Sequence, residues 1–317
     1  MIVSIVIPVY MNADGLKDLA NELVLREQEF TQLGIELQAV FVVDGSPDNS
    51  LAILLDLKKH RKLPQDSKVV KLSRNFGQIS ALLAGLEISD GECMICYSAD
   101  MQDPSKLFIT MYEHFRNGSE VVIATRESRS DGFIWDMTSK FGYALLRREV
   151  PNIPKGGFDF FLIGQKARKI LLDRAGSKRF LQADILHLGF QPVLIGYPRV
   201  KRMYGKSGYS FRRRLEVFVN AFFDSSDLPI KVATRLGFTI SICGFLSTLF
   251  VLFSYLRGDS PFNGFAAITS AILVIGGLQL GLIGILGEYI YRIYDINRNR
   301  PRFIIEKFYK SSQEILI

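Results

Sequence analysis

The stretch GECMICYSADMQDP, residues 91–104, decides the fold class, because an apolar run in it ends abruptly in acids. Cys93–Tyr97 is short and apolar without alternation, which is typical of a strand buried on both faces of a sheet. Asp100, Gln102 and Asp103 follow where that strand should end. Ligands bind beyond the carboxyl ends of such strands. The stretch therefore predicts an α/β protein with a polar site at one edge of a mostly parallel sheet.

The same arrangement repeats along the first two hundred residues. Amphipathic stretches near 15–33, 49–60, 78–89 and 104–117 alternate with apolar runs, which predicts a parallel sheet covered by helices on both faces. The further strands expected are Ile2–Val9, Gln38–Val43, Lys68–Leu72 and Val121–Thr125. Polar residues follow these strands at Asp44, Arg74 and Arg126, and we expect them to converge with Asp100 at one edge.

Composition limits the class of protein. The chain has 317 residues, of which 48% are hydrophobic and 22% charged, so a large core is expected. A net charge of +7 favours an anionic partner such as a nucleotide, a lipid phosphate or a membrane surface. Zinc-finger spacing and basic-aromatic RNA signatures are absent from the sequence, so no nucleic acid partner is expected. Cys93 and Cys96 lie inside the strand-like run, and we interpret them as core residues.

Two long uncharged segments, Leu236–Leu256 and Phe262–Gly287, predict transmembrane helices, because a bilayer core needs roughly 20 apolar residues per helix. Basic residues flank the pair, and only Arg257 lies between the two segments. The positive-inside rule then predicts a multi-pass protein of the bacterial inner (cytoplasmic) membrane with both termini cytoplasmic and the lipid bilayer as a partner. The glycines between 276 and 287 favour close helix packing and a homo-oligomer.

The predicted organisation has four parts. Residues 1–208 form a cytoplasmic α/β domain, 209–232 juxtamembrane amphipathic helices, 233–292 the two transmembrane helices, and 293–317 a cytoplasmic tail. Within the second part, SFRRRLEVFVNAFF at 210–223 has an apolar helical face with arginines elsewhere. This pattern favours an interfacial helix on the inner leaflet, and the alternative is an amphipathic helix packed on the domain.

The polar residues after the Cys93–Tyr97 strand suggest two roles, metal binding and helix capping. Asp100 and Gln102 offer the oxygen ligands that Mg²⁺ and Mn²⁺ prefer, as a nucleotide diphosphate would require. Asp103 directly precedes Pro104, which predicts the N-cap of the next helix. Asp100 is therefore the metal candidate, and Asp103 is expected to have mostly a structural role.

Several segments together resemble a known family. They are IVIPVY at 5–10, VVDGSPDNS at 42–50, LSRNFGQ at 72–78, SADMQDP at 98–104 and GGLQLGLIGILGEYIYRIY at 276–294. In order and spacing they resemble the polyprenyl-phosphate glycosyltransferases of glycosyltransferase family 2. That family includes bactoprenol glucosyltransferases and dolichyl-phosphate mannose synthases. The resemblance covers nearly the whole chain.

The resemblance implies a GT-A (Rossmann-like) fold and inverting transfer of a monosaccharide to undecaprenyl phosphate on the cytoplasmic membrane face. The donor implied is a nucleotide-diphosphate sugar, with a UDP-sugar such as UDP-glucose expected. A divalent metal is the implied cofactor, held by Asp100 and Gln102. The other site residues implied are Pro8, Tyr10, Asp44 and Arg74, with Asp100, for the donor nucleotide, Arg126, Arg129 and Arg202 for phosphates, and Asp159 and Arg202 for catalysis.

Three positions depart from the family pattern. Val43 and Ser98 stand where the family usually has acids, and Phe161 stands where it has arginine. Ser98 is a poorer metal ligand than a carboxylate, so we expect a weaker metal site that forms fully only with the donor bound. The alternatives are an altered donor preference, a lower metal dependence, or loss of activity in a catalytically impaired homologue that serves as a membrane scaffold or partner subunit. Asp159 lies between phenylalanines, where an unpartnered buried carboxylate would be costly, which favours a functional role.

Overall fold

The computed structural model describes residues 1–126, 153–154, 157–174, 180–198, 228–257, 264–297, 301–310 and 314–315. The chain divides into two compact units, one of Met1–Ser225 with Pro301–Ile317 and one of Ser226–Arg300.

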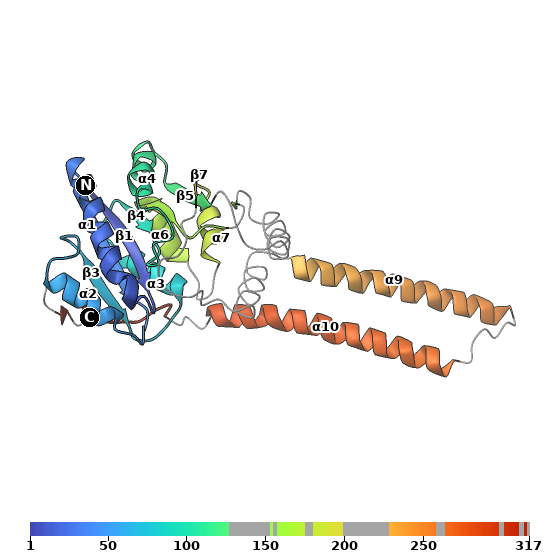
Figure 1. Cartoon of the computed structure of the whole chain (residues 1–317). Helices are drawn as coiled ribbons and strands as arrows, with labels where there is room; N and C mark the ends of the chain where they lie inside the picture. Colours follow the sequence, from blue (N-terminus) through green and yellow to red (C-terminus); the bar gives the residue numbers. More distant parts are fainter. Residues whose placement is uncertain are drawn as a thin grey trace. The chain divides into compact units, whose positions relative to one another are not determined.

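The first unit is built on one mixed sheet (Figure 1). Within the described residues its strand order is β7-β5-β6-β4-β1-β2-β3-β8-β9. The central strands β4, β1, β2 and β3 run parallel, while β6 and β8 pair antiparallel with their neighbours. The strands are β1 (Ile2–Val9), β2 (Glu36–Val43), β3 (Lys68–Leu72), β4 (Cys93–Cys96), β5 (Val121–Arg126), β6 (Phe161–Gly164), β7 (Val193–Tyr197), β8 (Ile305–Tyr309) and β9 (Glu314–Ile315).

Helices cover both faces of this sheet because successive side chains of a strand point to opposite faces. In β1, Val3, Ile5 and Ile7 join the core under α1, α2 and α4, while Val6 joins the core under α3, α6 and α7. The helices are α1 (Leu16–Gln32), preceded by the 3₁₀ turn η1 (Ala13–Gly15), α2 (Ser50–Lys59), α3 (Gln78–Ile88), α4 (Leu107–Arg116), α6 (Gln165–Arg174) and α7 (Leu181–Leu186).

The five strands predicted from the apolar runs are confirmed to within two residues at each end. The α/β class is also confirmed, with the difference that the sheet is mixed rather than mostly parallel. Cys93 and Cys96 are buried in β4, as predicted, and are free thiols. Burial raises the pKa of the Cys93 thiol to about 12, so this side chain stays protonated and behaves as an apolar core group.

The end of the chain returns to this sheet. Strand β8 pairs with β3, and the Ser73 backbone N–H donates to the Ile304 carbonyl at 3.0 Å. Lys71 and Glu306 form an ion pair of 2.8 Å across the two strands. Residues 293–317 were expected to form a tail, and those that the structure describes from 301 onward belong to the first unit.

Asp90 is part of a polar network at the amino ends of the central strands. Its Oδ2 accepts from Lys68 Nζ at 2.6 Å and from Gln38 Nε2 at 3.1 Å, and Lys68 is only 2% exposed. Burial would raise the pKa of Asp90, but the hydrogen bonds and charge of these partners outweigh it and hold the pKa below its usual value. The network therefore stabilises the fold only while Asp90 is ionised.

Asp90→Asn is expected to lower the free energy of unfolding at neutral pH and to have progressively less effect in acid. A depressed native pKa contributes stability that is complete above about pH 4 and is lost as the pH falls through the native pKa. Urea unfolding of wild type and variant between pH 7 and pH 3 measures this. Asp173→Asn, at an exposed carboxylate in α6, is the matched control. A loss that is the same at every pH would contradict the assignment.

The second unit consists of two long helices, α9 (Leu228–Leu256) and α10 (Phe265–Asn297) (Figure 1). The two predicted transmembrane segments fall within them. Counting only residues that the structure describes, neither helix offers a run long and apolar enough to cross a membrane. This finding contradicts the predicted multi-pass localisation in the bacterial inner membrane.

Candidate functional site

One edge of the sheet collects the predicted site. Strands β4, β1, β2 and β3 are parallel, and β6 runs against both β4 and β5, so β5 and its parallel neighbour β7 point the same way as β4. The carboxyl ends of β1, β2, β3, β4, β5 and β7 and the amino end of the antiparallel β6 therefore lie at the same edge of the sheet, which we call the carboxyl edge. The residues that the topology places there are Tyr10, Asp44, Arg74, Asp100, Arg126, Asp159 and Tyr197.

Asp44 anchors the loop that follows β3. It is only 3% exposed, and its two oxygens accept the backbone N–H groups of Phe76 at 2.7 Å and Gly77 at 2.8 Å. Burial raises the pKa of Asp44, although both hydrogen bonds and the nearby Arg74 act in the opposite direction. The Arg74 guanidinium lies 4.3 Å from the centre of the Phe76 ring. The structure thus brings two predicted nucleotide-binding residues, Asp44 and Arg74, into one small loop cluster.

Gly45→Ala is expected to destabilise the protein by about 2–5 kcal/mol, because it combines left-handed strain with a backbone clash. Gly45 has φ +57°, and a Cβ there would lie 2.4 Å from the Arg74 carbonyl carbon and the Asn75 nitrogen. Gly34→Ala is the matched control, since φ is +70° but nothing lies within 4 Å of the added carbon. It should cost about 1–2 kcal/mol. Urea unfolding measures both, and equal losses would mean that the Asp44 loop is not tightly packed.

Asp48 ties the loops after β1 and β2 together, a role that sequence reasoning missed. Its Oδ1 accepts from Ser46 Oγ at 2.6 Å, and its Oδ2 accepts from the Ala13 N–H at 3.1 Å. Ser46 Oγ accepts the Met11 N–H at 2.7 Å. Burial would raise the pKa of Asp48, but these and other hydrogen bonds hold it below its usual value. The Ser-Pro-Asp turn residues of VVDGSPDNS were the available signal.

Tyr10 and Pro8 lie at the end of β1 beside this loop cluster. Tyr10 is 44% exposed, so its ring is accessible to a ligand, and its backbone N–H donates to Asn12 Oδ1 at 3.0 Å. Pro8 is partly buried within β1. The structure therefore places both predicted base-pocket residues at the carboxyl edge.

The turn after β4 brings Asp100 and Gln102 together. Met101, between them, has φ +51°, a left-handed backbone that is uncommon for a side chain of this kind. The Gln102 N–H donates to Asp100 Oδ1 at 3.3 Å, and Gln102 is 6% exposed. A carboxylate and an amide supply hard oxygen donors, which fit Mg²⁺ or Mn²⁺. Among the described residues no three His, Cys, Asp or Glu side chains cluster as a metal-binding group.

Asp103 is not the predicted N-cap. Helix α4 begins at Leu107, because residues 104–106 first form a turn in which the Leu107 N–H donates to the Pro104 carbonyl at 3.1 Å. Asp103 is 2% exposed and contacts two polar partners from other strands. The Tyr197 hydroxyl donates to its Oδ1, and an Arg126 terminal nitrogen lies 3.5 Å from the same oxygen. Contrary to the prediction, Asp103 therefore does not cap the helix but contacts Arg126, which is a predicted site residue.

Arg126 lies between two carboxylates. One of its terminal nitrogens is 3.5 Å from Asp103 Oδ1 and 3.7 Å from Asp159 Oδ2, and its Nε donates to the Tyr197 hydroxyl at 3.2 Å. Burial would lower the pKa of Arg126, but Asp103, Tyr197 and Asp159 outweigh it and raise the pKa above its usual value. Arg126 therefore carries a permanent positive charge at the carboxyl edge.

Asp159 is half exposed, which corrects the expectation of a buried carboxylate. Its side chain is 52% exposed, while Phe158 and Phe160 on either side are buried. The chain bends at Asp159, so Phe158 packs against Phe161 in one core and Phe160 packs against Phe108 in the other, while the carboxylate lies outside both cores. Gln182 Nε2 reaches Asp159 Oδ1 at 3.5 Å. The structure thus joins Asp159 to Arg126, as two predicted site residues in one cluster. The other predicted arginines, Arg129 and Arg202, lie outside the described residues.

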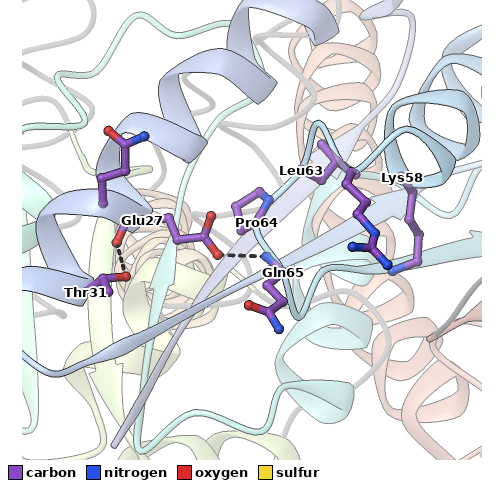
Figure 2. A pocket seen from close by; sticks show the side chains of 8 residues that line it. Glu27, Thr31, Lys58, Leu63, Pro64 and Gln65 are labelled. Carbon is purple, nitrogen blue, oxygen red and sulfur yellow. Dashed lines mark hydrogen bonds between the residues drawn. The ribbon is translucent and has the colours of Figure 1, made fainter.

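A cavity of about 740 Å³ lies away from this edge (Figure 2). Its lining comes from the ends of α1 and α2 and from the segment between α2 and β3, which the parallel strands place at the amino edge. Figure 2 shows Glu27 accepting the Gln65 N–H, at 2.7 Å. Lys58, also in the lining, donates to the Ser67 carbonyl. This cavity is therefore separate from the carboxyl edge, and Glu27 and Lys58 in its lining already have protein partners.

Comparisons with known proteins identify relatives along the whole chain. The sequence profile of the family described as "Glycosyl transferase family 2" matches residues 4–186. The uncharacterized glycosyltransferase YkcC of Bacillus subtilis is 31% identical over 96% of this chain and 94% of its own. A prophage-derived bactoprenol glucosyl transferase of Shigella flexneri is 30% identical over 98% of this chain and 100% of its own.

Among solved structures, one similar chain is glucosyl-3-phosphoglycerate synthase from Mycobacterium tuberculosis, in complex with Mn²⁺ and UDP-glucose. It is 14% identical in sequence, with a TM-score of 0.47, and the match covers 68% of this chain and 75% of that chain.

Proposed function

This chain belongs to glycosyl transferase family 2 and is a glycosyltransferase, and we propose that it transfers a monosaccharide from a nucleotide-diphosphate sugar to a polyprenyl phosphate. The observation that carries the proposal is the charged Arg126 guanidinium at the same sheet edge as Asp100. A cation at the same sheet edge as a carboxylate that can hold a metal suits a reaction that brings two phosphate-bearing substrates together. The Shigella relative named bactoprenol glucosyl transferase supports undecaprenyl phosphate as acceptor and glucose as the sugar.

The donor would bind across the loops after β1, β2 and β3. The accessible Tyr10 ring and Pro8 offer a surface for the base, with uracil expected. Asp44 shapes the loop that carries Arg74, whose guanidinium can meet the donor phosphates. UDP-glucose is the donor that we propose first.

A divalent metal would be held by Asp100 and Gln102. Bound there, Mg²⁺ or Mn²⁺ would neutralise charge on the donor diphosphate as it leaves. Two protein oxygens are fewer than such an ion needs, so donor phosphate oxygens would complete the ligand set. Ser98, in place of the family acid, fits a site that depends on the donor in this way.

Arg126 would bind the acceptor phosphate beside the sugar. A phosphate monoester is largely dianionic at neutral pH, so its oxygen can attack the anomeric carbon without a strong base. That oxygen forms the new bond as the bond from the anomeric carbon to the donor β-phosphate breaks, and the nucleoside diphosphate leaves. Attack from the face opposite the leaving group gives inversion. Asp159, which contacts Arg126, would lie close to the reacting atoms, and the resemblance adds Arg129 and Arg202 to the phosphate site.

The second unit, taken by itself, exposes apolar side chains that suit a lipid partner. Large apolar side chains are exposed on both helices of the second unit, including Phe238 at 70% and Leu280 at 71%. Exposed apolar patches of this kind favour binding of lipid or of other apolar partners. We therefore propose that the acceptor is used from a lipid bilayer. A homo-oligomer stays a prediction.

Binding of nucleotides tests the donor half of the proposal. Calorimetry on the full chain would compare UDP, GDP and UDP-glucose with Mg²⁺, with Mn²⁺ and with chelator. We expect uridine ligands to bind, more tightly with metal. Arg74→Ala should weaken that binding about tenfold, through the lost phosphate contact. Arg61→Ala, in the separate amino-edge cavity, should leave binding unchanged. Folded protein that binds neither UDP nor GDP ligands would overturn the proposed donor site.

A further inference from the structure

We infer that Asp103 and Tyr197 are positioning residues that hold the Arg126 guanidinium in the orientation needed to bind the acceptor phosphate. The inference rests on the proposed function, because it takes Arg126 as the phosphate-binding group. It adds Asp103 and Tyr197 to the site and explains why a carboxylate is buried at position 103.

The three side chains form a directed chain of hydrogen bonds. The Arg126 Nε–H donates to the Tyr197 hydroxyl at 3.2 Å, and that hydroxyl donates its own proton to Asp103 Oδ1. The same Asp103 oxygen lies 3.5 Å from an Arg126 terminal nitrogen. Arg126 is therefore held at two points, Nε and one terminal nitrogen, which restricts rotation of the guanidinium plane. A hydroxyl that accepts from a cation is polarised toward donating to an anion, so each bond strengthens the other.

The backbone keeps these partners in place. Arg126 and Tyr197 are directly opposite each other on the parallel strands β5 and β7. The Tyr197 ring is 2% exposed and packs edge-on against Phe160, with ring centres 6.2 Å apart. The Asp103 carbonyl accepts the Tyr97 hydroxyl at 2.8 Å, which fixes the turn that presents the carboxylate. Neither Asp103 nor Tyr197 can leave Arg126 without disrupting packed structure.

The second carboxylate near Arg126 differs in accessibility. Asp159 is 52% exposed, and its oxygen is 3.7 Å from the guanidinium, whereas the Asp103 side chain is 1% exposed. A phosphate arriving from solvent can compete with Asp159 for Arg126, but it has no route to the buried side occupied by Asp103. The Arg126 side chain itself is 23% exposed, so part of the guanidinium is accessible. The buried side of the Arg126 guanidinium is thus held by Asp103, and the exposed side, next to Asp159, is the side that can bind the phosphate.

One buried atom favours this purpose over a purely structural one. Asp103 Oδ2 is buried, and within the described part of the chain it has no hydrogen-bond partner. A buried polar atom without a partner costs stability, so the carboxylate is not placed here to maximise it. Its ionic contact is with Arg126, a group of the site.

Tyr197→Phe tests the inference, because it removes only the hydroxyl and keeps the packed ring. Steady-state transfer would be measured while undecaprenyl phosphate and the sugar donor are varied separately. We expect kcat/KM for the acceptor to fall about tenfold, with the donor KM changed less than twofold. Tyr112→Phe is the matched control, since its buried hydroxyl points to Met1 Sδ in another part of the fold. It should leave both constants unchanged.

A second variant and a direct probe complete the test. Asp103→Asn should lower acceptor kcat/KM by at least as much as Tyr197→Phe, with thermal unfolding reporting that the protein is folded. The ¹⁵N NMR signal of the Arg126 Nε–H should exchange with water faster in Tyr197→Phe than in wild type. Unchanged acceptor constants in both variants, with wild type active, would overturn this inference alone. No transfer by folded wild type to undecaprenyl phosphate would overturn the proposed acceptor and this inference with it.

Discussion

Arg126→Lys is expected to lower kcat/KM for undecaprenyl phosphate by about a hundredfold, and Arg126→Ala by about a thousandfold or more. Loss of one preorganised donor to a charged reacting group costs this much in other enzymes. Lysine keeps the charge but has neither the planar fork nor the Nε–H that reaches Tyr197. Initial rates against acceptor concentration measure the effect. The alanine variant also leaves Asp103 buried without its cation, so it is expected to be less stable.

Arg168→Lys is the control for this change. Arg168 donates to the Glu87 carbonyl at 2.8 Å, away from the carboxyl edge, so its replacement should leave acceptor kinetics unaltered. Arg126→Lys protein that unfolds at the wild-type temperature and keeps wild-type acceptor kinetics would remove Arg126 from the phosphate site.

Asp100→Asn is expected to lower the transfer rate at saturating metal by about a hundredfold and to raise the metal concentration needed for half-maximal rate. Asparagine keeps the size of the side chain but loses the negative charge that a divalent cation needs. With Ser98 already in place of an acid, Asp100 is the one carboxylate predicted to hold the metal. Rates against Mn²⁺ concentration measure the change, and Asp173→Asn, at an exposed carboxylate in α6, is the control. An unchanged metal requirement would exclude Asp100 as a ligand.

The sequence predicted the parts of the site that follow from strand ends. Asp44, Asp100 and Arg126 each come directly after an apolar run or at its end, and parallel pairing brings such positions to one edge. Asp100 and Gln102 were predicted as a metal-binding pair; the Gln102 N–H donates to Asp100 Oδ1, and metal binding by the two side chains stays a prediction.

Contacts between strands that are far apart in the sequence could not be predicted from the sequence. The hydrogen bond between Arg126 and Tyr197 joins positions 71 residues apart. It forms because β7 pairs with β5, although β6, α6 and α7 lie between these strands in the sequence. The ion pair between Lys71 and Glu306 spans 235 residues, because β8 returns to β3. A local pattern shows which residues form a strand but does not show which strand will pair with it.

Two further expectations, for Asp103 and Asp159, were wrong because contacts with residues far away in the sequence override the local sequence pattern. Asp103 before Pro104 has the pattern of an N-cap, but the contacts with Arg126 and Tyr197 hold its carboxylate away from the helix. Asp159 between phenylalanines was expected to be buried, but only the rings face the core. Asp103, to which the local rule gave a structural role, instead contacts Arg126, and the functional role predicted for Asp159 stays a prediction.

The most direct measurement is sugar transfer by the purified full chain to undecaprenyl phosphate. A panel of UDP- and GDP-sugars would be tested with Mg²⁺, with Mn²⁺ and with chelator, and the lipid product would be identified by mass spectrometry and its anomeric configuration by NMR. The account predicts one preferred donor, UDP-glucose, metal-dependent product and inverted configuration at the anomeric carbon. Product that forms equally well in chelator would contradict the metal role of Asp100 and Gln102. Folded protein that forms no polyprenyl-phosphate sugar from any donor of the panel would contradict the central claim.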